Sequence, residues 1–140
     1  MTKKSDDIVI TCALRTPIGK YNGNLGSYKS YDLGSIVIKN LLLKSKISAS
    51  DIDEVVLGQV LTGNTGQNPA RQAAINGGIP INKTAYIINQ VCGSGLRSIA
   101  SAYQSLKAKD ANIIIAGGQE SMTNCDKNVM LKDGLIDVYN

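Results

Sequence analysis

The chain has 140 residues, of which 43% are hydrophobic and 19% are charged, so it can bury a core of its own as one globular domain. Its 15 basic side chains outnumber the 11 acidic ones, and the resulting net charge of +4 is compatible with an anionic ligand. The basic residues are scattered and no aromatic residues alternate with them, which argues against a nucleic-acid-binding protein.

The N-terminal part of the chain is predicted to hold two strands and two helices. The apolar run 8–14 predicts a buried strand, followed by a glycine-rich loop. Apolar residues recur at helical spacing over 32–46, with Asp32 as the N-cap. A short strand is predicted over 55–60. A second helix is predicted over 69–76, because it begins with a proline at a position that needs no N–H and stops at two glycines.

The C-terminal part continues the alternation of strands and helices. A strand is predicted over 85–89, a long amphipathic helix over 92–109, and a continuous apolar strand over 111–116. The pattern weakens over 126–140, where one or two helical turns are predicted. Continuous apolar strands that alternate with helices indicate an α/β fold, with a mostly parallel sheet covered by helices on both faces.

The cysteines and the absence of histidine limit the kinds of site that the chain can form. Cys12, Cys92 and Cys125 are widely spaced, odd in number and without a Cys-x-x-Cys pair, so neither a disulfide framework nor a metal site is expected. No apolar run has the length of a membrane span or a signal peptide. We therefore expect no membrane association and a cytoplasmic location.

The segment Asn89–Leu96, with the sequence NQVCGSGL, is the strongest candidate for chemistry. It places Cys92 between a strand and a helix N-terminus, where the helix dipole favours a thiolate. Gly93 and Gly95 would leave room for a substrate carbonyl, and N–H groups of the first helical turn could hold an oxyanion. From the residues alone, a structural cysteine at a helix cap remains an equally good interpretation.

The same glycines also suggest a dinucleotide-binding loop, because they follow a strand and open a helix. The pattern Gly93-x-Gly95-x-x-Ser98 lacks the third glycine of that fingerprint. No acidic residue downstream clearly takes the place of the ribose-binding one. A dinucleotide-binding site is therefore disfavoured.

Four segments together resemble the thiolase family. In order and spacing they match its signatures: RTPIGK at 15–20, GNTGQNPARQA at 63–73, NQVCGSGLRSI at 89–99 and AGGQESMT at 116–123. The chain is thus similar to the N-terminal portion of a thiolase, with Cys92 in the place of the acyl-accepting nucleophile. The resemblance implies an incomplete N-terminal half of the layered αβαβα thiolase fold, with residues 1–124 as a partial N-terminal domain.

The resemblance also implies an activity, which is reversible Claisen condensation or thiolysis. Cys92 would form an acyl-thioester from acyl-CoA, as in an acetyl-CoA C-acetyltransferase, with a coenzyme A thioester as substrate and no bound cofactor. The residues that bind coenzyme A remain unassigned. A β-ketoacyl synthase-like condensing enzyme is the alternative within the same superfamily, and the RTPIGK and GQNPARQA segments disfavour it.

The family's other catalytic groups are a histidine in a GHP motif, an asparagine in an NEAF-like motif and a second cysteine in CxGGG. None of these motifs occurs in the 140 residues, which contain no histidine. Loss of the activating base alone typically costs at least about 10²–10⁴ in rate. We therefore expect no turnover by this chain alone. It would be completed by a complementary C-terminal thiolase chain, or it would be a non-catalytic, dimer-forming remnant.

The last residues depart from the family in a second way. The segment 132–137, KDGLID, resembles a KDGLxD stretch that lies further along in thiolases, so the intervening residues are inferred to be deleted. Residues 125–140 are accordingly expected to be a shortened remnant of the loop-domain region, and a tetramer is not expected. In the family the strand before the nucleophile pairs across a dimer, which predicts a homodimer through residues 85–89.

Overall fold

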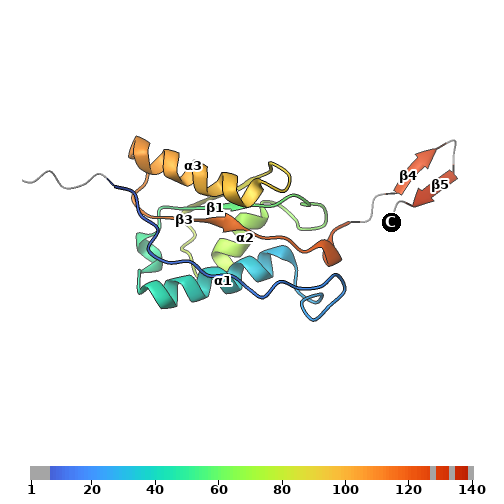
Figure 1. Ribbon diagram of the computed structural model, residues 1–140, viewed down its shortest axis with the longest axis horizontal. Helices are drawn as coiled ribbons and strands as arrows, with labels where there is room; N and C mark the ends of the chain where they lie inside the picture. Colours follow the sequence, from blue (N-terminus) through green and yellow to red (C-terminus); the bar gives the residue numbers. More distant parts are fainter. Residues whose placement is uncertain (1–6, 127–128, 133–134, 139–140) are drawn as a thin grey trace, which may run out of the picture.

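The computed structural model describes residues 7–126, 129–132 and 135–138, and Figure 1 shows the arrangement of its elements. The main body contains three strands that alternate with three helices. In chain order these are α1 (Ser30–Ser45), β1 (Glu54–Gly58), α2 (Pro69–Asn76), β2 (Thr84–Ile88), α3 (Ser94–Ala108) and β3 (Ile114–Gly118). Two short 3-10 turns, Ala49–Asp51 and Met122–Asn124, complete it.

The three strands form one parallel sheet in the order β2-β1-β3. Helix α3 packs on one face, and α1 and α2 lie together on the other (Figure 1). The central strand β1 is covered on both sides, and Val55 and Val56, whose side chains point to opposite faces, are both fully buried. The predicted α/β fold with helices on both faces of a parallel sheet is confirmed. No helix among the described residues is long and apolar enough to cross a membrane.

The core is aliphatic and lies mainly between β1 and the α1–α2 pair. It contains Ile38 of α1, Leu57 of β1 and Ala73 of α2, all almost completely buried. Burying a side chain such as Ile38 or Leu57 contributes about 1.5–3 kcal/mol. Small alanines on α2 let α1 approach closely, because they fill little of the space between the helices.

The prediction of a strand over residues 8–14 is wrong. This segment pairs with no strand in the described structure, and Val9 and Ile10 are 69% and 77% exposed. The apolar pattern has the composition of a strand, but a strand also needs a neighbour to which its backbone can hydrogen-bond. The segment runs along the outside of the body instead (Figure 1).

The prediction of helical turns in the tail is also wrong. Val129–Lys132 (β4) and Leu135–Val138 (β5) form an antiparallel hairpin, with Lys132 opposite Leu135. The sequence signal is Asp133-Gly134, because Asp-Gly between two apolar runs favours a two-residue hairpin connection.

Helix α1 begins at Ser30, two residues earlier than predicted, so Asp32 is not its N-cap. Asp32 occupies the third helical position, and its carboxylate accepts a hydrogen bond of 2.9 Å from the backbone N–H of Lys29. A negative charge in the first turn also interacts favourably with the helix dipole. Asp32 therefore still stabilises the start of the helix, from inside it.

Helix α3 lies directly against the backbone of the sheet, because glycines face each other across the contact. A Cβ atom on Gly58 of β1 would lie 2.2 Å from the carbonyl carbon of Ser94, and one on Gly118 of β3 would lie 3.2 Å from the Cα of Gly95. Neither position leaves room for a methyl group without movement of backbone atoms. The start of α3 is thus held at a distance from the sheet that only glycine permits.

We expect Gly58→Ala to destabilise the protein by about 1–3 kcal/mol, because the added methyl group must displace the α3 backbone. The matched control is Gly117→Ala, since a Cβ atom there meets no atom within 4 Å. Urea unfolding followed by circular dichroism measures both. Equal midpoints for the two variants would contradict the close-packing argument.

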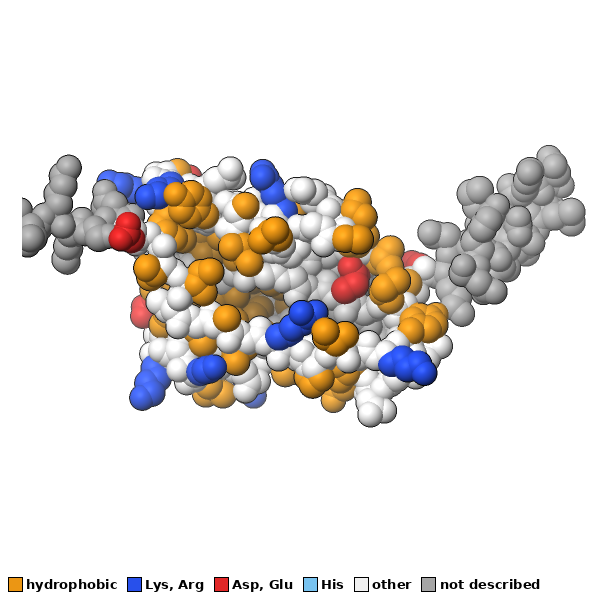
Figure 2. All heavy atoms as spheres, in the orientation of Figure 1, with side chains coloured by type: hydrophobic (Ala, Val, Ile, Leu, Met, Phe, Trp, Pro, Cys, Tyr) orange, Lys and Arg blue, Asp and Glu red, His pale blue; other side chains and the backbone are white. Residues whose placement is uncertain are grey.

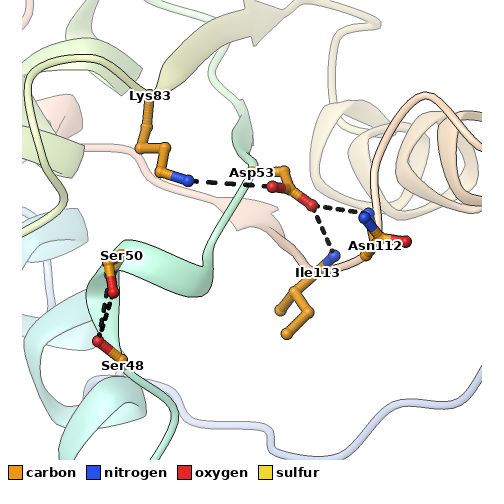
Figure 3. A network of polar contacts seen from close by, with 6 residues as sticks. All are labelled: Ser48, Ser50, Asp53, Lys83, Asn112 and Ile113. Carbon is orange, nitrogen blue, oxygen red and sulfur yellow. Dashed lines mark hydrogen bonds and ion pairs between the residues drawn. The ribbon is translucent and has the colours of Figure 1, made fainter.

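Asp53 joins the starts of the three strands (Figure 3). Its carboxylate accepts hydrogen bonds from the backbone N–H groups of Asn112 at 2.7 Å and Ile113 at 3.3 Å, and lies 3.9 Å from Lys83 Nζ. The hydrogen bonds from Asn112 and Ile113, with a smaller contribution from Lys83, hold the pKa of Asp53 below its ordinary value. The ionised form of Asp53 therefore stabilises the fold.

The sign of this effect predicts a pH dependence. Because the pKa of Asp53 is lower in the folded chain than in the unfolded chain, its stabilisation is full above the unfolded pKa and is lost as the pH falls through the folded value. We expect Asp53→Asn to lower the urea midpoint at neutral pH and to have a smaller effect in acid. Asp51→Asn, at an exposed aspartate two residues away, is the control. An Asp53→Asn effect that does not change with pH would contradict this account.

Candidate active site

Cys92 lies in the five-residue turn that connects the end of β2 at Ile88 with the start of α3 at Ser94. Its side chain is exposed and its thiol is free. The position confirms the predicted junction of strand and helix, although the helix begins two residues after Cys92 and Gly93 is its N-cap. A reagent in solution can therefore reach the sulfur.

The turn depends on an unusual backbone conformation at the residue before the cysteine. Val91 has φ = +48°, in the left-handed region that β-branched residues rarely adopt. Such a conformation costs about 1–3 kcal/mol and persists only where surrounding contacts fix it. The side chain of Val91 is 64% exposed, so apolar burial offsets little of this cost. Hydrogen bonds to the backbone of the turn must therefore hold Val91 in place.

Ser94 supplies two of those hydrogen bonds. Its hydroxyl is buried, accepts from the N–H of Gln90 at 2.9 Å and donates to the carbonyl of Val91 at 2.6 Å. The backbone N–H of Ser94 also donates to Val91 O at 3.0 Å, and the N–H of Gly93 donates to Gln90 O at the same distance. The serine of the CGSGL segment is thus a structural part of the turn.

These contacts change two expectations about the glycines and the helix start. The N–H groups of Gly93 and Ser94, expected to be available to an oxyanion, are used within the turn. Gly95, expected to clear a path to the sulfur, instead faces Gly118 in the contact between α3 and the sheet. The sequence pattern could not separate these roles. A glycine that leaves room for a substrate and a glycine that lets a strand pack closely give the same pattern.

Polar side chains that follow the three strands meet beside the turn, because the carboxyl ends of parallel strands lie at one edge of the sheet. They hold the backbone of residues 60 and 61. Glu120 accepts from the N–H groups of Val60 at 2.8 Å and Leu61 at 3.3 Å. Gln59 Nε2 donates to Leu61 O at 2.7 Å, and Asn89 Nδ2 donates to Val60 O at 3.0 Å.

Sequence reasoning placed Asn89 in the candidate segment 89–96 and Glu120 in the signature 116–123, but it did not predict that they and Gln59 hold the ends of the strands together. A signal was available, since each comes one or two residues after a strand of the same parallel sheet. A further glutamine, Gln119, donates to Gln59 Oε1 at 2.9 Å inside the protein. The strand ends are therefore joined by side-chain hydrogen bonds as well as by the sheet ladder.

The described residues contain a small hollow near this edge but no site for a metal. The hollow, of about 170 Å³, is lined by Val60, Leu61, Thr62, Gly63, Cys125 and Asp126. It is too small for a nucleotide-sized ligand.

Within the described ranges no three histidine, cysteine or acidic side chains come together as metal ligands. Cys125 donates its thiol hydrogen to Met122 O at 3.0 Å, and Cys12 is half-buried in the N-terminal segment.

One face of α3, next to Cys92, carries apolar side chains that are exposed in the described part of the chain. Leu96 is 74% exposed, and Ile99 and Tyr103 follow it at helical spacing and are also exposed. Apolar side chains are visible over much of the face shown in Figure 2. An exposed apolar stripe of this kind is a feature of contact surfaces.

Comparison with known proteins places the chain in a family. Residues 8–139 match the model of "Thiolase, N-terminal domain". The chain is 51% identical to a "Probable acetyl-CoA acetyltransferase" of Escherichia coli over 84% of its length, and 43% and 46% identical to proteins called "Acetyl-CoA acetyltransferase" of Rhizobium meliloti and Yarrowia lipolytica over 94%. The chain belongs to the thiolase family, as its motifs predicted.

The chain spans only 30%, 38% and 36% of the length of these three relatives, in the order given. The alignment to the Rhizobium meliloti protein has 148 positions, more than the 140 residues of the chain. That alignment therefore contains positions at which the relative has residues and this chain has none.

Proposed function

We propose that the chain carries the acyl-accepting half of a thiolase-type acyltransferase, with Cys92 as the nucleophile and acetyl-CoA as the acyl donor. The observation that carries the proposal is the exposed thiol of Cys92 on a hydrogen-bonded turn, in a chain 43–51% identical to proteins named for acetyl transfer. No cofactor is required, because the coenzyme is part of the substrate.

The first chemical step is a transfer between two thiols. The sulfur of Cys92, after losing its proton, attacks the carbonyl carbon of the thioester. The bond from that carbon to the coenzyme A sulfur breaks, and coenzyme A leaves as a thiolate that takes up a proton. The products are S-acetyl-Cys92 and free coenzyme A, so atoms and charge balance without an oxidant or reductant.

The later condensation step needs groups that these 140 residues do not supply. They contain no histidine, and the other cysteines, Cys12 and Cys125, lie in the N-terminal segment and beyond β3. We therefore propose that turnover requires a complementary thiolase chain, and that these residues alone stop at the acyl-thioester. The exposed stripe of α3 at Leu96, Ile99 and Tyr103 supports such a contact. The second candidate is a non-catalytic remnant.

We also propose a boundary at residue 124, after which 125–140 are a shortened form of a longer family segment. Alignments longer than the chain support the shortening, since they contain residues of the relatives that this chain lacks. A cytoplasmic location is part of the same proposal, because acetyl-CoA is an intracellular substrate.

The acetylation step can be tested by intact mass. We expect a gain of one acetyl group after incubation with acetyl-CoA, and no gain in Cys92→Ala. The control is Cys12→Ser/Cys125→Ser, which retains Cys92 as the only cysteine and is expected to be acetylated like the parent. A protein that is folded by circular dichroism and remains unmodified would contradict the enzymatic proposal and favour the remnant.

Self-association is expected through β2, the strand at one edge of the described sheet. An unpaired edge presents N–H and C=O groups to a second copy of the chain. Light scattering coupled to size exclusion should give about twice the chain mass of 14.8 kDa. The variant Leu96→Glu/Tyr103→Glu should remain dimeric, because it changes only the α3 stripe. A monomer at every concentration would contradict the dimer. A monomeric Leu96→Glu/Tyr103→Glu variant would show that α3, and not β2, forms the interface.

A further inference from the structure

The side chain of Asn89 connects the turn that carries Cys92 with the segment that follows β1. Its Oδ1 accepts a hydrogen bond from the backbone N–H of Val91 at 3.0 Å. Its Nδ2 donates to the carbonyl of Val60, also at 3.0 Å. Both ends of one amide are therefore used, one on each segment.

The Val91 end of this connection bears on a strained residue. At φ = +48° the backbone of a valine is strained, and this conformation persists only where neighbouring groups hold it. Ser94 binds the carbonyl of Val91, whereas Asn89 binds its N–H. The peptide groups on both sides of the Val91 Cα are thus held, and Cys92 is the next residue along the chain.

The Val60 end is itself fixed to the sheet. The N–H of Val60 donates to Glu120, which follows β3, and the neighbouring Leu61 O accepts from Gln59, which follows β1. Asn89 follows β2, so the ends of all three strands contribute to this one connection. The turn is in this way connected by hydrogen bonds to the ends of the sheet strands.

We propose that Asn89 is a positioning residue that holds Val91 in the left-handed conformation and so fixes the direction in which the Cys92 thiol points. It contacts the backbone of Val91 and does not need to touch the sulfur or the substrate. The inference rests on the proposed role of Cys92 as the nucleophile. Its structural part, the hold on Val91, can be measured independently of acetyl transfer.

Two properties are to be measured in each variant of the chain: hydrogen exchange of the residue-91 amide by NMR, and the rate of acetylation of Cys92 by acetyl-CoA. Asn89→Ala removes both hydrogen bonds, so exchange at Val91 should rise and acetylation should fall, each by at least about fivefold. Asn89→Asp keeps an acceptor for the Val91 N–H, so it should retain protection there while losing the bond to Val60 O.

The decisive variant is Val91→Gly, because glycine adopts a positive φ without strain. If Asn89 acts by holding Val91, then Asn89→Ala should slow acetylation much less in the Val91→Gly background than in the parent chain. A role of Asn89 in general stability would give the same loss in both backgrounds. Asn82→Ala, at an exposed asparagine just before β2, is the control for substitution of an asparagine, and urea midpoints exclude global unfolding.

The outcomes separate the two proposals. Unchanged exchange at Val91 in Asn89→Ala, or equal losses of acetylation in both backgrounds, would overturn the positioning role. Unchanged acetylation in Asn89→Ala despite faster exchange would overturn it as well. If the parent chain is never acetylated but exchange at Val91 rises in Asn89→Ala, the hold on Val91 stands and the proposed function of Cys92 fails.

Discussion

The contact of α3 with the backbone of the sheet determines where the turn that carries Cys92 lies. Gly58 and Gly118 on the strands and Gly95 on the helix leave only backbone at this contact, so the start of α3 sits closer to the sheet than side chains would permit. Because the turn before α3 must then bridge a short gap from the end of β2, it is tightly folded. The left-handed Val91 is part of that tight path.

The energetic cost of the turn is offset by polar groups rather than by apolar burial. Ser94 is buried beneath the turn, and its hydroxyl satisfies one donor and one acceptor of the backbone. In the segment after β1, Glu120 accepts from two backbone N–H groups and Asn89 donates to one carbonyl. Hydrogen bonds each contribute modestly, but they have strict geometry, so a set of them specifies one conformation more sharply than burial does. The turn that carries the exposed Cys92 is held in this way.

The sequence predicted the parts of the structure that depend on local pattern. The short strand predicted over 55–60 is present as β1 (Glu54–Gly58), and Pro69 correctly marked the first residue of α2. Cys92 was placed correctly between a strand and a helix because its neighbours show both patterns. The strand predicted over 8–14 failed because strand formation needs a pairing partner, which no local pattern can provide. The tail failed for a different reason, since Asp133-Gly134 was a local signal that was missed.

The roles of the glycines and of the first-turn N–H groups could not be predicted, because they depend on which backbone lies opposite. Gly95 meets Gly118, a residue 23 positions away, and the Gly93 N–H meets a carbonyl three residues back.

The candidate site has two sides. The side of the turn that faces the sheet is determined within the described residues, whereas the side of α3 that carries Leu96 is open to solvent. The turn that carries the Cys92 thiol and the exposed apolar stripe therefore depend on different surfaces of the same helix. A change on the open surface can alter association and leave the turn intact.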